Sequence, residues 1–208
     1  MRIAAQSRSY KPNKAGFFFT SHDPSLYQDQ VTTRKSISSS EISSAIEKIA
    51  ADIAATHSGT KTLVLAAIAN GGIAFSELLR ARLLESHGLQ THSATIDISF
   101  HRDDIGVNPI SKEVESTSLV QNPEDATIIL TDDVIFSGRS VRAALSELHA
   151  LGRPRKVELA ILVDRGNRRL PIEPNYRGIG EPTTIDEKVE VHLFPRNPEK
   201  SHVDILSP

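Results

Sequence analysis

Short aliphatic runs alternate with helical patterns along this chain of 208 residues. The runs at 62–68, 127–130 and 157–163 consist mostly of Val, Ile, Leu, Ala and Thr, without the regular polar alternation of a half-exposed strand. Such runs are typical of strands that are covered on both faces. Strands that alternate with helices predict an α/β fold with a mainly parallel sheet, whose functional loops gather at the carboxyl ends of the strands.

Composition restricts the class of protein further. A hydrophobic content of 38% fits one α/β domain, and the absence of cysteine excludes disulfides, a thiolate nucleophile and a thiolate zinc site. No apolar run reaches the ~18 residues needed to cross a bilayer, so we expect a soluble, cytoplasmic protein. The net charge of −2 gives no overall attraction to nucleic acid. The eight histidines show no zinc-binding spacing, and no zinc site is predicted.

The start of the chain differs from the rest. Residues 1–36 lack any hydrophobic period, contain Pro12 and Pro24, and have no acid before Asp23. We predict a flexible N-terminal extension over 1–36 and a single domain over 37–208. An organelle transit peptide is the alternative, but Pro12 and the lack of an amphipathic stripe argue against it.

An acidic pair and a turn of small residues follow the run 127–130. Asp132 and Asp133 are good acceptors for the vicinal hydroxyls of a ribose, whereas they would repel a phosphate placed beside them. The turn offers hydroxyls, a glycine and the free N–H groups of a helix start, which attract a phosphate. The predicted sugar phosphate site comprises Asp132, Asp133, Val134, Ser137, Gly138, Arg139 and Ser140. The alternative is an ordinary strand–turn–helix junction in which Asp133 caps the helix.

Two further segments have the composition of phosphate-binding loops. Asn70, Gly71 and Gly72 lie between a buried strand and a helix, and we predict that they bind the pyrophosphate of the same ligand. A long polar stretch from His101 to Asp125 has little periodicity. We predict that its Arg102 closes over the ligand, with Asp103 and Asp104 beside it, although a solvated surface loop has the same composition.

The next aliphatic strand ends in Val163, Asp164 and Arg165, where we expect base recognition; an ion-paired turn is the alternative. Nine basic residues between 139 and 177 outnumber four acidic ones, which predicts a possible surface for RNA or an ordinary solvated face. The nine are Arg139, Arg142, Arg153, Arg155, Lys156, Arg165, Arg168, Arg169 and Arg177.

Four segments together resemble a known family. They are 97–104, 132–144, 152–154 and 162–172, and their order and spacing are similar to those of the PyrR family of pyrimidine operon attenuation proteins and uracil phosphoribosyltransferases. The resemblance covers roughly residues 38–206. It differs at Gly71, where the family often has Arg, at His101, where the family usually has Tyr, and in the extra N-terminal residues.

The resemblance implies a type I phosphoribosyltransferase fold, with a parallel core and a small hood. It also implies a Mg²⁺-dependent reaction of uracil with phosphoribosyl pyrophosphate to give UMP, a homo-oligomer, and in many members binding of pyrimidine leader RNA that senses UMP. In this reaction Asp132, Asp133 and Arg102 would be the catalytic residues, and Mg²⁺ would be held mainly by substrate. A non-catalytic nucleotide-sensing regulator and a transferase acting on a purine base remain alternatives.

Overall fold

The computed structural model describes residues 32–99 and 123–208. Five parallel strands form the central sheet, in the order β3-β2-β4-β5-β6. Their bounds are β2 Leu63–Ile68, β3 His92–Ile96, β4 Thr127–Ile135, β5 Lys156–Asp164 and β6 Tyr176–Gly180. The predicted mainly parallel α/β architecture is therefore confirmed.

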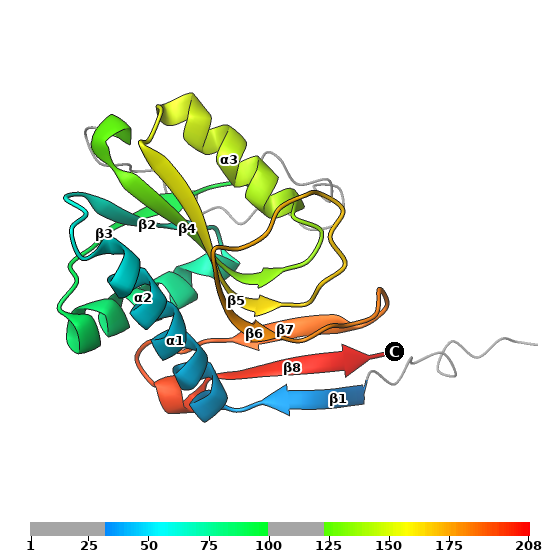
Figure 1. Ribbon diagram of the computed structural model, residues 1–208. Helices are drawn as coiled ribbons and strands as arrows, with labels where there is room; N and C mark the ends of the chain where they lie inside the picture. Colours follow the sequence, from blue (N-terminus) through cyan, green and yellow to red (C-terminus); the bar gives the residue numbers. More distant parts are fainter. Residues whose placement is uncertain (1–31, 100–122) are drawn as a thin grey trace, which may run out of the picture. The chain divides into compact units, whose positions relative to one another are not determined.

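Helices cover both faces of this sheet (Figure 1). α1 (Ser39–His57) and α2 (Gly71–His87) pack on one face, and α3 (Arg139–Leu151) packs on the other. Successive residues of β4 alternate between the two cores, since Ile129 joins the first and Ile128 the second. Because both faces are covered, the polar groups that bind a ligand are expected at the strand ends and not on the faces.

A second, smaller sheet forms the predicted hood. It consists of β1 (Thr32–Ile37), β8 (His202–Ser207) and β7 (Lys188–His192), paired antiparallel in that order. Two 3₁₀ turns, Pro123–Asp125 and Pro198–Lys200, complete the regular structure of the described residues. None of the helices in these residues is long and apolar enough to cross a bilayer.

Several predicted boundaries were wrong. β1 occupies residues 32–37, so ordered structure begins inside the segment predicted to be a flexible extension, and β1 is held there by pairing with β8. β4 does not end at Leu130 but continues to Ile135, because β5 keeps pairing with it as far as Ile135↔Asp164. The rest of the predicted extension, 1–31, lies outside the described residues.

Candidate active site

The acidic pair lies on β4 just beyond the point where its neighbour β2 stops pairing. The last β2–β4 pair is Ala67↔Thr131, so Asp132 and Asp133 border the space that β2 leaves. Asp132 is buried and Asp133 is half-buried. The backbone N–H of Asp133 donates to Asp132 Oδ1 at 3.1 Å, and the N–H of Val134 donates to Asp133 Oδ1 at 2.8 Å.

Burial raises the pKa of Asp132 well above its usual range, and repulsion from the Asp133 carboxylate raises it further. The pKa of Asp133 is also raised, mainly by burial. Within residues 32–99 and 123–208, no ion pair with a basic side chain compensates either charge. Two such adjacent carboxylates can accept hydrogen bonds from sugar hydroxyls or act as ligands of a divalent cation.

The glycine turn predicted to bind pyrophosphate contacts this pair directly. It follows β2, with a cis peptide bond between Ala69 and Asn70, and α2 begins at Gly71. A Cβ on Gly71 would lie 2.6 Å from Asp133 Oδ1, and one on Gly72 would lie 2.3 Å from the carbonyl oxygen of Thr131. The structure therefore brings together two segments that are 60 residues apart, and only glycine fits at Gly72 without a shift of backbone.

The predicted phosphate turn links β4 to α3. Gly138 has a φ of 87°, a left-handed conformation that favours glycine, and it caps the start of α3. Arg139 and Ser140 are exposed in the first turn of the helix, where backbone N–H groups have no carbonyl partner within the helix and can bind an anion; the N–H of Arg139 lies 3.4 Å from Ser137 Oγ. The carbonyl oxygen of Ser137 accepts hydrogen bonds from the N–H groups of Arg169 (3.0 Å) and Leu170 (3.2 Å).

Arg168 joins the turn after β4 to the turn after β5, next to the two hydrogen bonds of Ser137. The sequence did not reveal this connection. The Arg168 guanidinium donates to the carbonyl oxygens of Phe136 (3.1 Å), Ile172 (3.0 Å) and Gly166 (3.3 Å), and pairs with Asp164 at 2.8 Å. Arg168 had been counted only among the surface cations. It is a positioning residue, and the acid four positions earlier, Asp164, is a sequence signal that could have indicated a pair with Arg168.

The predicted base-recognition residues lie at the end of β5, and their side chains already have partners. Val163 is fully buried, and Asp164 is paired with Arg168 and, at 3.5 Å, with Arg177. Arg165 packs its guanidinium 4.3 Å from the centroid of the Phe136 ring. It also donates to Thr183 Oγ1 (2.7 Å) and to the carbonyl oxygens of Thr184 (3.0 Å) and Glu187 (2.6 Å). Arg165 therefore holds the segment 183–187 near the site.

The nine basic residues between 139 and 177 do not form one surface. Arg165 and Arg168 point inward, as described, and α3 separates Arg139 from Arg153 by about 20 Å of helix. Lys156 is paired with the nearly buried Glu158 at 2.5 Å. The sequence could not show this division, because the inward orientation of Arg165 and Arg168 depends on partners that are distant in the sequence.

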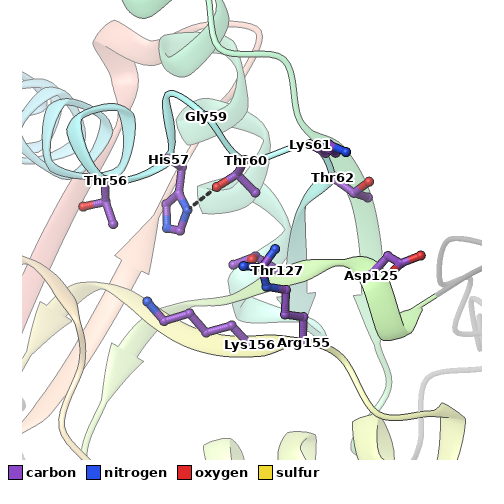
Figure 2. A pocket seen from close by; sticks show the side chains of 10 residues that line it. All are labelled: Thr56, His57, Gly59, Thr60, Lys61, Thr62, Asp125, Thr127, Arg155 and Lys156. Carbon is purple, nitrogen blue, oxygen red and sulfur yellow. Dashed lines mark hydrogen bonds between the residues drawn. The ribbon is translucent and has the colours of Figure 1, made fainter.

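A cleft of about 700 Å³ is lined by ten residues, none of which belongs to the acidic pair or its turns (Figure 2). Its lining residues precede or begin β2, β4 and β5, so they mark the amino ends of these strands. The residues are Thr56, His57, Gly59, Thr60, Lys61, Thr62, Asp125, Thr127, Arg155 and Lys156. We favour the acidic pair as the centre of the chemistry, because strand carboxyl ends carry the ligand sites of open α/β sheets.

Three predicted site residues, Arg102, Asp103 and Asp104, lie outside the described residues, and their roles stay predictions.

Comparison with known proteins identifies the fold and the family. The sequence matches the phosphoribosyl transferase domain family over residues 37–196. The bifunctional protein PyrR of Corynebacterium efficiens is 42% identical over 149 residues, covering 71% of this chain and 75% of that protein. The chain belongs to the PyrR family of phosphoribosyltransferases.

Other relatives agree with this assignment. The bifunctional protein PyrR of Chloroflexus aurantiacus is 36% identical over 157 residues, which is 76% of this chain and 86% of that protein. A crystal structure of HGPRT-ase from Leishmania tarentolae in complex with GMP has a TM-score of 0.63, covering 84% of this chain and 96% of that one. At 17% identity that likeness shows the shared fold alone. The resemblance to the PyrR family that the sequence motifs indicated is confirmed, as is the phosphoribosyltransferase class of enzyme.

Proposed function

We propose that this PyrR family member transfers the ribose 5-phosphate group of phosphoribosyl pyrophosphate to uracil, giving UMP and pyrophosphate, and that it also regulates pyrimidine genes by binding leader RNA. The observation that carries the first part is the contact between the backbone of Gly71 and the carboxylate of Asp133. This contact places the glycine turn beside the acidic pair, so that one molecule of phosphoribosyl pyrophosphate can bind to both.

The roles of the residues follow from charge. Asp132 and Asp133 accept hydrogen bonds from the ribose hydroxyls, and their negative charge favours the cation-like sugar that forms as pyrophosphate leaves. The turn Asn70–Gly72 offers backbone N–H groups to the pyrophosphate, and the turn Ser137–Ser140 offers them to the 5-phosphate. The anionic groups of the substrate are thus held at helix starts, one at each end of the acidic pair.

The implied Mg²⁺ fits these residues. Asp132 and Asp133 supply hard oxygen ligands without a competing cation among the described residues, and burial raises the pKa of both, with repulsion from Asp133 adding to it at Asp132. When bound with the substrate, Mg²⁺ would neutralise part of the pyrophosphate charge.

Uracil would lie near the end of β5. Arg165 holds the segment 183–187 there, while Asp164 positions Arg168, so the segment 183–187 and the turn after β5 would border the base. Arg102 would close over the site, with Asp103 and Asp104 adjacent to it in sequence.

An assay with radiolabelled uracil, phosphoribosyl pyrophosphate and Mg²⁺ tests the enzyme. We expect UMP from the wild-type protein, no turnover from the Asp132→Asn/Asp133→Asn variant, and normal turnover from Asp52→Asn, which changes an exposed carboxylate on α1 that pairs with Lys48. Parallel reactions with hypoxanthine and guanine examine the purine alternative. Equal turnover by the wild type and the double variant would contradict the assigned site.

The cleft in Figure 2 favours RNA binding as the second function. Lys61 and Arg155 line it, and neither has an ion pair within the described part of the chain. Two available cations beside hydroxyl groups are suited to a phosphate backbone. Such a regulator would act in the cytoplasm, where transcripts are made, and we expect it to act as a homo-oligomer.

Electrophoretic shift of a pyrimidine leader RNA, with and without UMP, tests this second function. Lys61→Glu/Arg155→Glu should weaken binding and lower its dependence on salt, because fewer counterions are released. The charge-matched control is Arg80→Glu/Lys200→Glu, which removes two cations from outside the cleft. Equal losses in both variants would place the RNA elsewhere.

A further inference from the structure

The pairing of β7 with β8 brings four potential metal ligands onto one side of the hood sheet. His192 lies opposite His202, and Glu190 lies opposite Asp204. Strand alternation places all four on the same face, since Val203 between the two β8 ligands is fully buried in the core. The four ligands are therefore on the face turned away from the core.

Three of these side chains already converge. Ligand atoms of His192, His202 and Asp204 lie within 4.8 Å of one another, and each residue is partly exposed. The two imidazole rings stack with their centroids 4.6 Å apart and an angle of 26° between their planes. Glu190 Oε2 lies 3.9 Å from His192 Nε2, so a fourth ligand is close by.

A backbone hydrogen bond sets the tautomer of His202. Its Nδ1 lies 3.0 Å from the carbonyl oxygen of Lys200, and because a carbonyl can only accept, Nδ1 must carry the hydrogen. In the neutral ring Nε2 then has a free lone pair, and it lies 3.9 Å from Asp204 Oδ2, another acceptor. Two acceptors facing each other are stabilised by a cation between them. In metal-binding histidines the other ring N–H usually donates to a carbonyl or a carboxylate, which fixes the tautomer and the orientation of the ring.

We propose that His192, His202 and Asp204 bind a divalent transition-metal ion, for which Zn²⁺ is the best match. Zn²⁺ accepts imidazole nitrogen together with carboxylate oxygen, commonly with four ligands, and Glu190 or water supplies the fourth. Rotation of the exposed side chains brings the ligand atoms to the Zn–N distance of about 2.0–2.1 Å. Mg²⁺ does not fit, because it prefers oxygen ligands alone.

This proposal departs from the expectation, drawn from histidine spacing, that the chain has no zinc site. His192 and His202 are ten positions apart in the sequence, and only the strand register makes them neighbours. Among the described strands β7 pairs only with β8, so an ion on the outer face would join an edge strand to the sheet. Because such an ion binds the folded chain, it stabilises the hood. The proposal is independent of the transferase activity, since none of its ligands belongs to the acidic pair or its turns.

Calorimetric titration of the metal-free, full-length protein with Zn²⁺ tests the site, together with thermal unfolding in the presence of Zn²⁺ or Mg²⁺. We expect saturable binding of one Zn²⁺ per chain and a higher Tm with Zn²⁺ but not with Mg²⁺. His192→Ala and His202→Ala should each weaken binding by about 100-fold or more, since loss of an outer-shell partner alone costs about 10- to 100-fold. The control His92→Ala removes an exposed histidine from β3 and should bind as the wild type does.

Absence of saturable Zn²⁺ binding in the wild type, or equal affinity in the wild type, His192→Ala and His202→Ala, would overturn the proposal. Circular dichroism of each metal-free variant verifies folding. Should either alanine variant be unfolded, Asp204→Asn takes its place, because it keeps the size of the side chain and weakens only the ligand. Unchanged affinity in Asp204→Asn overturns the proposal in the same way.

Discussion

The carboxyl groups of Asp132 and Asp133 are adjacent and largely shielded from water. Their raised pKa values mean that, as pH rises above the ordinary pKa of aspartate, the folded protein keeps protons that the unfolded chain has already released. Stability therefore falls as pH rises from the ordinary pKa of aspartate toward the raised values. The pair costs folding free energy at neutral pH, and we attribute its presence to ligand binding.

We expect Asp132→Asn/Asp133→Asn to increase stability while it removes activity. The gain in the free energy of unfolding at neutral pH should be about 0.5 to 2 kcal/mol, the usual size of a stabilising substitution. The difference from the wild type should widen as pH rises from the ordinary pKa of aspartate through the raised pKa values, because the wild-type carboxylates become charged there. Denaturant unfolding across this range measures it. A variant that is less stable than the wild type at neutral pH would contradict the argument.

Gly71 and Gly72 are neighbours with different constraints, so alanine should affect them differently. At Gly72 the new Cβ meets backbone, and we expect Gly72→Ala to lower the free energy of unfolding by about 1 to 3 kcal/mol, as overpacking does. At Gly71 it meets the end of the Asp133 side chain, which can rotate away. Gly71→Ala should therefore keep most of its stability but raise the KM for phosphoribosyl pyrophosphate.

The two glycine variants serve as controls for each other. Thermal unfolding and initial-rate kinetics on both proteins separate the effects. Loss of stability in Gly71→Ala as large as that in Gly72→Ala would show that the Asp133 carboxylate is fixed and does not yield.

At the scale of secondary structure elements, Arg168 fixes the turn after β4 against the turn after β5. We expect Arg168→Ala to lower the free energy of unfolding by about 1 to 3 kcal/mol, because carbonyl oxygens and Asp164 lose a buried partner. The KM for phosphoribosyl pyrophosphate should rise, since the phosphate turn loses its support. Arg169→Ala is the matched control, because the exposed Arg169 contributes its backbone N–H and not its side chain. Equal effects of both substitutions on KM would exclude a positioning role for Arg168.

The elements that the sequence predicted are those whose pattern is local. The aliphatic run 62–68 predicts β2 without reference to the rest of the chain. β1 was missed because only Ile37 faces the core, so its sequence has no alternation to detect. The acidic pair was recognised from its chemistry, but the inward orientation of Arg165 and Arg168 depends on partners 18 and 32 positions away.

At the scale of the whole domain, β1 connects the hood sheet to the segment that Arg165 holds. Arg34 pairs with Glu181 (3.1 Å) and Glu187 (2.5 Å), and Lys35 pairs with Glu181 at 2.6 Å. In these pairs the cations are exposed and the glutamates are largely buried, and the pairs place 181–187 between β1 on one side and Arg165 on the other. The segment nearest the predicted uracil position is thus supported from the N-terminal strand.

Two truncations of the chain test this connection. A protein that starts at residue 32 keeps β1, whereas one that starts at residue 38 loses it together with Ile37, which is 1% exposed in the core. We expect the shorter protein to have a free energy of unfolding lower by about 2 to 5 kcal/mol, since the loss of one buried isoleucine side chain alone costs that much. Its KM for uracil should rise more than its KM for phosphoribosyl pyrophosphate, because β1 supports the base side of the site and makes none of the described contacts with the acidic pair. Equal rises in both KM values would indicate a general loss of folding, and no change in either would show that 181–187 is held by Arg165 alone.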